Sequence, residues 1–234
     1  MKKLFTLVLI CLSAPFLAQK PITIINQDWD NNQWNDESRI TNNYGSNDHI
    51  LSSLEEEWTN PPGVWQNNTL TTFQTLPSGN IEEYISQSWI VPASVWANAV
   101  RASYTYANDK PKTINYYNWV TDTWVNYMKM TNDYDGAGFL VSELQQSWES
   151  TESAWENISL TNYTNLPNGN IEQSIMQIWD DDENQWVNSM RNIHDYSANR
   201  LSTIVTQMWM GTDWINLNRE TYTYDSNGRE WTQK

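Results

Sequence analysis

The tryptophans are the residues whose number and spacing most suggest chemistry. Fourteen of the fifteen fall into pairs, and the first members of successive pairs lie 29, 31, 30, 29, 31 and 30 residues apart. The pairs are Trp29/Trp34, Trp58/Trp65, Trp89/Trp96, Trp119/Trp124, Trp148/Trp155, Trp179/Trp186 and Trp209/Trp214. Exposed aromatic rings can stack on the apolar faces of sugars, while Asn, Gln and Asp bind hydroxyl groups. One interpretation is therefore a carbohydrate-binding module, with Trp58, Trp65, Trp148 and Trp155 as candidate stacking residues.

A structural role for the pairs is the favoured interpretation. Sugar sites need a few aromatic residues at special places, whereas equal use in every unit is typical of a scaffold. In a sheet of repeated hairpins, equivalent positions recur at regular distances. We therefore expect a continuous ladder of rings, each pairing across its own hairpin and with neighbouring units. A fully buried ring of this kind stabilises a sheet by roughly 2–3 kcal/mol.

Acid–base and metal chemistry find little support in the sequence. The two histidines, His49 and His194, lie near neither a serine elbow nor a metal-ligand spacing. The acidic runs Glu55–Glu57, Glu82–Glu83 and Asp180–Glu183 are adjacent charges, which a solvated face explains better than a pair of catalytic carboxylates. The last run also lacks the spaced carboxylates of a calcium loop. We expect no enzyme activity, no catalytic residue, no metal site and no cofactor.

Alternation with a period of two indicates that strands carry these residues. The second residue before the first tryptophan is Gln in five of seven units, and the fourth is usually apolar. Asn follows two residues after the second tryptophan in six units, and an aromatic residue follows eight or ten residues after it. Such alternation is typical of half-buried strands. Pieces rich in Asn, Asp, Gly and Pro separate the strands, as expected for hairpin connections.

A longer period of 90 residues lies above the shorter one. LPSGNIE at Leu76–Glu82 recurs as LPNGNIE at Leu166–Glu172. We therefore predict an all-β antiparallel meander of about seven hairpins of roughly thirty residues, with strands of about eight to ten residues, forming an extended or spiralling sheet. The array would occupy residues 19–234.

The first eighteen residues predict export. Lys2 and Lys3 precede a short apolar run and small residues, which is the layout of a signal peptide cleaved after Ala18. The single cysteine, Cys11, would leave with it, so no disulfide is expected. This favours a secreted or extracytoplasmic protein of the envelope or surface of a Gram-negative bacterium.

The charge of the mature chain restricts its partners. Removing Lys2 and Lys3 from 13 basic residues leaves 11 against 28 acidic residues, a net charge of −17. Nucleic acid and anionic lipid would be repelled, so neither is expected as a partner, and no membrane insertion is expected. A glycan or another surface protein is the expected partner, and exposed sheet edges favour self-association. A transmembrane β-barrel with two aromatic girdles is a third interpretation, which the repeated Asn and Gln and the mean hydropathy of −0.69 disfavour.

Two turns resemble a known repeat family. YDGAG at Tyr134–Gly138 and YDSNGR at Tyr224–Arg229 resemble the Tyr-Asp motif of the YD/RHS repeats. That resemblance implies a β-meander and a non-catalytic role outside the cytoplasm, in structure or binding. It is partial, because Tyr44-Gly45 and Tyr196-Ser197 lack the Asp, and because Leu76–Asn80 and Leu166–Asn170 are expected to use a different turn.

Overall fold

The protein is described by a computed structural model that covers residues 20–225 and 230–233. Fifteen strands form one sheet in chain order, each antiparallel to its neighbours. The strands are β1 (Thr23–Asp30), β2 (Gln33–Tyr44), β3 (Ile50–Thr59), β4 (Val64–Thr75), β5 (Ile81–Ile90), β6 (Val95–Ala107), β7 (Lys110–Val120), β8 (Thr123–Tyr134), β9 (Leu140–Glu149), β10 (Ala154–Asn165), β11 (Ile171–Asp180), β12 (Gln185–Ser197), β13 (Arg200–Trp209), β14 (Trp214–Tyr224) and β15 (Glu230–Gln233). The predicted all-β meander is confirmed, although most strands are longer than the predicted eight to ten residues.

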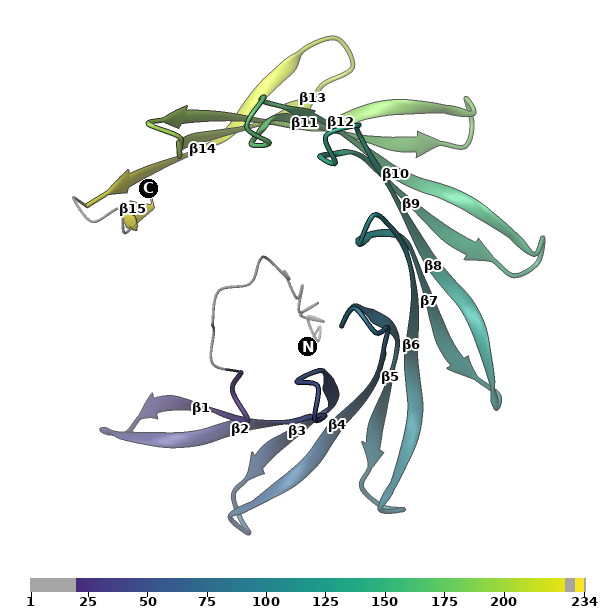
Figure 1. The fold of residues 1–234 in the computed structure, drawn as a ribbon, viewed down its shortest axis with the longest axis vertical. Coiled ribbons are helices and arrows are strands. Elements are labelled where there is room, and N and C mark those ends of the chain that lie inside the picture. Colours follow the sequence, from purple (N-terminus) through teal and green to yellow (C-terminus); the bar gives the residue numbers. More distant parts are fainter. Residues whose placement is uncertain (1–19, 226–229, 234) are drawn as a thin grey trace.

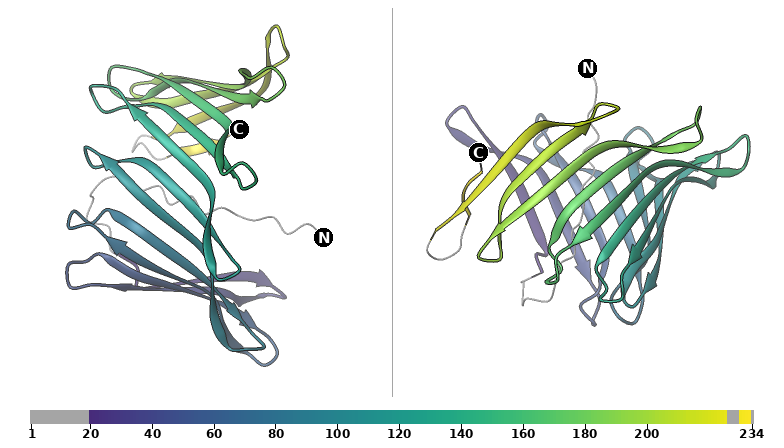
Figure 2. Two further views of the ribbon diagram at one scale, coloured as in Figure 1. Left: turned by 90° about the vertical axis from the view of Figure 1, so that its right-hand side faces the viewer. Right: turned by 90° about the horizontal axis from the view of Figure 1, so that it is seen from above.

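The sheet curls into an open C in which the first and last strands do not pair (Figure 1). The strands are tilted and twisted across the curve (Figure 2). The part of the chain that the structure describes contains no helix able to span a membrane. The predicted signal peptide, residues 1–18, and Cys11 lie outside the described residues.

Tight turns connect the strands at the tryptophan end of each hairpin. Asn31 and Asn32 have φ of 53° and 62°, and Thr121 and Asp122 have φ of 47° and 61°. Two successive positive φ values define the type I′ turn, whose twist matches that of the flanking strands. Gly211, with φ of 87°, supplies the positive φ in the last of these turns.

At the opposite ends of the hairpins, the connections after β2, β4, β8 and β10 share one turn despite their different sequences. In LPSGN, Gly79 N donates to Leu76 O and Leu76 N donates to Asn80 O. The YDGAG turn has the same two bonds, from Gly138 N to Asp135 O and from Asp135 N to Phe139 O. The expectation of a different turn at Leu76–Asn80 and Leu166–Asn170 is therefore wrong. Leu76 and Asp135 can occupy the same position because both backbone hydrogen bonds of the turn use only the N–H and the carbonyl of that residue.

A β-bulge recurs at one position in all seven tryptophan hairpins. Three residues after the second tryptophan, one residue has no partner on the facing strand. These residues are Glu37, Asn68, Ala99, Tyr127, Ile158, Ser189 and Leu217. Bulges increase the local twist of a strand. Seven in equivalent places explain why the sheet curls steadily instead of lying flat.

The sheet is a single layer with two faces and almost no core. The cross-strand register places the paired tryptophans on one face, here the tryptophan face. The tyrosine face is opposite and carries Phe73, Tyr84, Tyr104 and Tyr116. Ala102 is the one buried apolar residue among those described. The chain exposes 16528 Å², whereas a compact monomer of its mass exposes about 11,000 Å².

Candidate functional site

The paired tryptophans face each other directly across their hairpins. In every pair the ring centroids are 4.9–5.2 Å apart, with interplanar angles of 60–70°. This edge-to-face geometry stabilises an aromatic pair by about 0.5–1.5 kcal/mol beyond area burial. The predicted pairing within each hairpin is confirmed seven times.

The predicted ring contacts between neighbouring hairpins are not found among the described tryptophans. Basic side chains make the contact instead. Arg39 lies 4.8 Å from the ring centre of Trp65 in the next hairpin, and Arg191 lies 4.7 Å from that of Trp214. Successive hairpins are two strand spacings apart, roughly 10 Å, which is too far for indoles to touch but within reach of a long cationic side chain.

The four candidate stacking residues form two separate pairs. Trp58 and Trp65 join β3 to β4, while Trp148 and Trp155 join β9 to β10. All four rings are half-buried. Arg39 lies over Trp65, and Lys129 lies 4.8 Å from the ring centre of Trp155. The structure therefore does not bring the four residues together, and two of the four rings already carry a cation.

The glutamines and asparagines beside the tryptophans bind each other. Gln87 donates to Asn98 at 3.0 Å, and Gln146 donates to Asn157 at 3.0 Å. Equivalent bonds join Gln27 to Asp36, Gln177 to Asn188 and Gln207 to Asn216. The glutamines and the asparagines are both visible in the sequence at a fixed spacing of two residues from a tryptophan. Because each glutamine bonds to the residue opposite it across the hairpin, the two spacings are equal.

A row of tyrosines joins the two strands of their own tryptophan hairpins, at the end away from the indoles. Tyr134 Oη donates to Pro111 O at 2.9 Å, and Tyr196 Oη donates to Ile171 O at 2.8 Å. Tyr106 bonds in the same way to Ile81, and Tyr224 to Leu201. Burial raises the pKa of Tyr106, Tyr134 and Tyr196. These tyrosines extend the hydrogen bonding of the sheet beyond the backbone.

Four aromatic rings gather in the middle of the tyrosine face. The ring centre of Tyr84 is 6.1 Å from that of Phe73 and 6.3 Å from that of Tyr104. Burial, reinforced by the nearby Tyr116, raises the pKa of Tyr84 to about 12. Burial also raises the pKa of Tyr104 and Tyr116. These phenols stay protonated under ordinary conditions and can donate hydrogen bonds.

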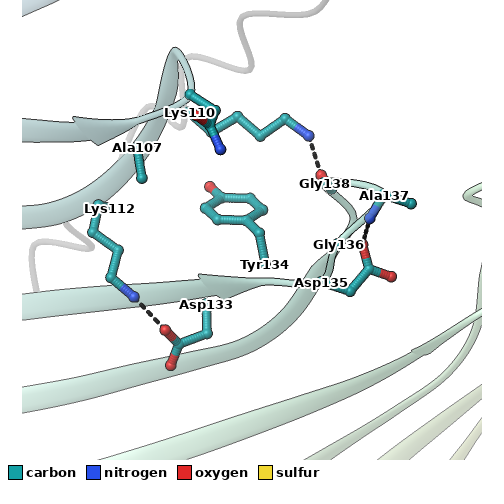
Figure 3. A pocket seen from close by; sticks show the side chains of 10 residues that line it. Ala107, Lys110, Lys112, Asp133, Tyr134, Asp135, Gly136, Ala137 and Gly138 are labelled. Atoms are coloured by element: carbon teal, nitrogen blue, oxygen red, sulfur yellow. Dashed lines mark hydrogen bonds and ion pairs between the residues drawn. The ribbon is translucent and has the colours of Figure 1, made fainter.

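A pocket of about 420 Å³ lies at the turn after β8 (Figure 3). Lys110 donates to Gly138 O and lies over the ring of Tyr134, while Lys112 pairs with Asp133. The hydrogen bond from Lys112 lowers the pKa of Asp133. Lys20 over Tyr44, 90 residues earlier, and Arg200 over Tyr224, 90 residues later, repeat the cation–ring contact. A contact found three times fastens the turns and does not mark a unique site.

The histidines lie apart in the fold. His49 follows β2, where its Nδ1 contacts Asn47 at 2.9 Å. His194 lies in β12, burial lowers its pKa, and its buried Nδ1 has no hydrogen-bond partner. The Nδ1 of His49 also lies 3.3 Å from the hydroxyl of Thr75.

The acidic runs also have structural partners. Glu56 is only 8% exposed and pairs with Arg39 at 2.7 Å, so the expectation of a fully solvated run at Glu55–Glu57 is wrong. Glu83 pairs with Arg101 at 2.8 Å. Asp180 accepts bonds from the backbone N–H groups of Asp182 and Glu183, which closes its turn. Residues 20–225 and 230–233 contain no group of three or more His, Cys, Asp or Glu side chains placed to share a metal ion.

Comparison with known proteins yields low similarities only. No family model matches the sequence, and no curated protein matches it. A DUF3836 family protein from Bacteroides vulgatus is 18% identical, with 38% of this chain and 89% of that chain covered and a TM-score of 0.33. A porin-like protein from Bacteroides uniformis is 10% identical, with 84% and 82% covered and a TM-score of 0.44. The TcdB2-TccC3-Cdc42 structure is 9% identical, with 90% of this chain and 12% of that chain covered and a TM-score of 0.40.

Proposed function

We propose that this chain is a non-catalytic, secreted or cell-surface repeat protein whose open sheet serves as a structural and binding surface. The observation that carries the proposal is the absence of a second layer over the described strands. Both faces of one sheet meet solvent, and nearly every large side chain remains partly exposed. A surface of this extent gives partners room to bind, while the interlocked side-chain rows hold it in shape.

The residues that could do chemistry are already bonded to other groups of the sheet, which supports a role without catalysis. Arg39, Arg101 and Lys112 are in ion pairs with carboxylates, and the tyrosine row bonds to backbone carbonyls. These groups stabilise the sheet and are not arranged around one reacting centre. A relation to the YD/RHS repeats belongs to the same proposal, and it rests on the motif YDGAG at Tyr134–Gly138.

Glycan binding is the second candidate, and the first hairpin favours it. Trp29 and Trp34 are 58% and 64% exposed, whereas the other paired tryptophans are half-buried. Gln27 and Asp36 lie beside them on the same face. Exposed indoles next to an amide and a carboxylate suit the stacking and hydroxyl contacts of a sugar. The candidate therefore shifts from Trp58, Trp65, Trp148 and Trp155 to the first pair.

Fractionation and activity measurements test the proposal. The tagged full chain should be found outside the cytoplasm and be cleaved by protease added to intact cells. Purified residues 19–234 should hydrolyse no glycoside, ester or peptide in a broad panel. Retention in the cytoplasm, or a hydrolysis that His194→Ala abolishes, would contradict it.

A polysaccharide screen tests the second candidate. Binding that Trp29→Ala and Trp34→Ala remove together, while Trp58→Ala and Trp65→Ala leave it, would support glycan binding at the first hairpin. Binding that survives loss of both exposed rings would exclude that site.

A further inference from the structure

The last two tryptophan hairpins carry an apolar patch on the tyrosine face. Ile178 pairs with Val187 in the sixth hairpin, and Met208 pairs with Ile215 in the seventh. Met190 in β12 pairs with Met208 in the adjacent β13, which joins the two hairpins. Cross-strand partners share a face and lie side by side. Ile178, Val187, Met190, Met208 and Ile215 therefore form one continuous surface over β11–β14, here the C-terminal apolar patch.

The earlier hairpins provide an internal comparison for this patch. We compare the residue before the first tryptophan with the residue after the second, which pair with each other on this face. In the first five hairpins they are Asp28/Asn35, Glu57/Gln66, Ser88/Ala97, Asn118/Val125 and Ser147/Glu156. Eight of these ten residues are polar. The same backbone positions become Ile178/Val187 and Met208/Ile215 in the last two. The fold therefore tolerates polar residues at these two positions, and only the last two hairpins have apolar residues at both of them.

The patch is accessible and hollowed. Ile178, Val187, Met208 and Ile215 are 48%, 36%, 38% and 51% exposed. A pocket of about 610 Å³ is lined in part by Ile178, Val187 and Met208. Contiguous exposed apolar surface in a water-soluble chain marks an interaction site, and methionine adapts its shape to a partner.

The charge around the patch defines the chemistry of its partner. Asp180, Asp181 and Asp182 line the same pocket, and no basic side chain lines it. Charged rims select partners of opposite sign. A second copy would bring another strongly acidic chain, of net charge −17 after removal of Lys2 and Lys3, against this rim.

We propose that the C-terminal apolar patch is a protein-docking surface for a partner segment that presents apolar side chains flanked by lysine or arginine. The apolar side chains fill the pocket beside Ile178 and Met208, and the basic groups face Asp181 and Asp182. The inference rests on the proposed binding role and gives it a location and a class of partner.

Two model peptides test the docking surface. Purified residues 19–234 are titrated into a labelled short peptide of alternating leucine and lysine, and into one of alternating leucine and glutamate, with fluorescence anisotropy as the readout. We expect the basic peptide to bind at least about tenfold more tightly than the acidic one, with a marked loss at high salt.

The chain's own repeats supply the test variants. Ile178→Ser with Val187→Glu installs the residues of the fifth hairpin, Ser147 and Glu156. We expect it to weaken binding about tenfold or more while the circular dichroism spectrum is unchanged. Val64→Ser is the control, because Val64 is also 48% exposed but lies in another hairpin; it should bind as the wild type does.

A charge variant tests the rim separately. Asp181→Asn with Asp182→Asn leaves the turn-closing carboxylate of Asp180 in place. This variant should bind the basic peptide several-fold more weakly than the wild type does, and its binding should depend less on the salt concentration.

Several results would overturn the inference. One is equal binding of both peptides; another is wild-type affinity in the variant with Ile178→Ser and Val187→Glu. Binding of zwitterionic vesicles that the same variant removes would assign the patch to a membrane. A concentration-dependent dimer that this variant abolishes, seen by sedimentation without peptide binding, would assign it to a second copy. None of these results bears on export or on the lack of catalysis, so the proposed function is tested independently.

Discussion

Single side chains stabilise this sheet from both faces, because no second layer formed by the described residues covers it. On the tryptophan face, indole pairs close each hairpin and arginines reach across to the next one. On the tyrosine face, phenol groups bond to backbone carbonyls of the partner strand in the same hairpin. These contacts are short-ranged and repeated, so each one stabilises its own part of the sheet.

Removing one ring of a central pair should therefore lower the free energy of unfolding more than removing one ring of the pair at the edge of the sheet. For Trp119→Ala we expect a loss of about 2 kcal/mol in the free energy of unfolding, because the half-buried indole surface and the edge-to-face contact with Trp124 are both removed. Trp34→Ala, whose ring is 64% exposed, should cost less than about 1 kcal/mol. Urea unfolding followed by circular dichroism measures both. Equal losses would show that the pairs do not act through burial.

The buried phenols predict a dependence of stability on alkaline pH. The pKa of Tyr84 is about 12 in the fold, against about 10 in an unfolded chain. Because the folded pKa is the higher one, the stabilisation is complete below pH 10 and is lost as the pH rises towards 12. Tyr84→Phe keeps the ring and removes the titration, so its stability should fall less steeply over that window. Urea unfolding at several alkaline pH values checks this. Parallel curves for the variant and the wild type would contradict it.

At the scale of the element, the hairpin turns impose a positive φ at a fixed position. Gly79, Gly138 and Gly169 have φ of 92°, 85° and 87° there. Asp48 occupies the equivalent position with φ of 62°. Its N–H donates to Gly45 O in the same pattern. A residue with a Cβ is strained in this conformation by roughly 1–2 kcal/mol.

Exchanging these residues should change stability in opposite directions. Asp48→Gly should stabilise the protein by up to about 1 kcal/mol, since the relief of strain exceeds the added chain entropy. Gly169→Ala should destabilise it by more than about 1 kcal/mol, because its φ is positive and a Cβ there would collide with the ring of Phe139. Thermal unfolding of both variants gives the comparison. A destabilised Asp48→Gly variant would show that the Asp side chain has a role of its own.

The elements themselves could be predicted from the sequence because alternation and turn residues act locally. The spacing of tryptophans indicated the pairing across each hairpin, and the 90-residue period indicated equivalent positions. The bulges could not be predicted, since residues as different as Glu37, Ala99 and Leu217 occupy them. The contacts between hairpins were also missed, because they depend on the twist that those bulges introduce. The C-terminal apolar patch becomes visible only when the register shows which residues share a face.

At the scale of the whole molecule, the sheet is a one-dimensional array in which each strand pairs only with its chain neighbours. Stability in such arrays is approximately a sum of units and the interfaces between them. The chain should therefore tolerate loss of whole units, provided that the cut joins equivalent turns.

Deleting residues 110–199 should leave a folded, shorter sheet. The deletion joins Asp109 to Arg200 and replaces one type I′ turn by its equivalent, because Asn108 and Asp109 have φ of 51° and 60° and Ala198 and Asn199 have φ of 50° and 61°. We expect a β-sheet circular dichroism spectrum and a lower unfolding temperature. The control deletes residues 100–174, which joins Ala99 in β6 to Ile175 in β11; a strand that runs away from its tryptophan would then continue into one that runs towards its tryptophan, and the variant should fail to fold. Equal behaviour of both deletions would contradict the additive picture.

The antiparallel meander also determines how the molecule responds to mechanical load. Its first and last strands lie at opposite edges of one sheet, so a pull on them acts across the strands and opens their backbone hydrogen bonds one after another. Rupture under such a load proceeds hairpin by hairpin at low force, and the chain can lengthen many-fold without breaking a covalent bond. A protein built in this way on a cell surface would behave as an extensible tether that shortens again when tension is released.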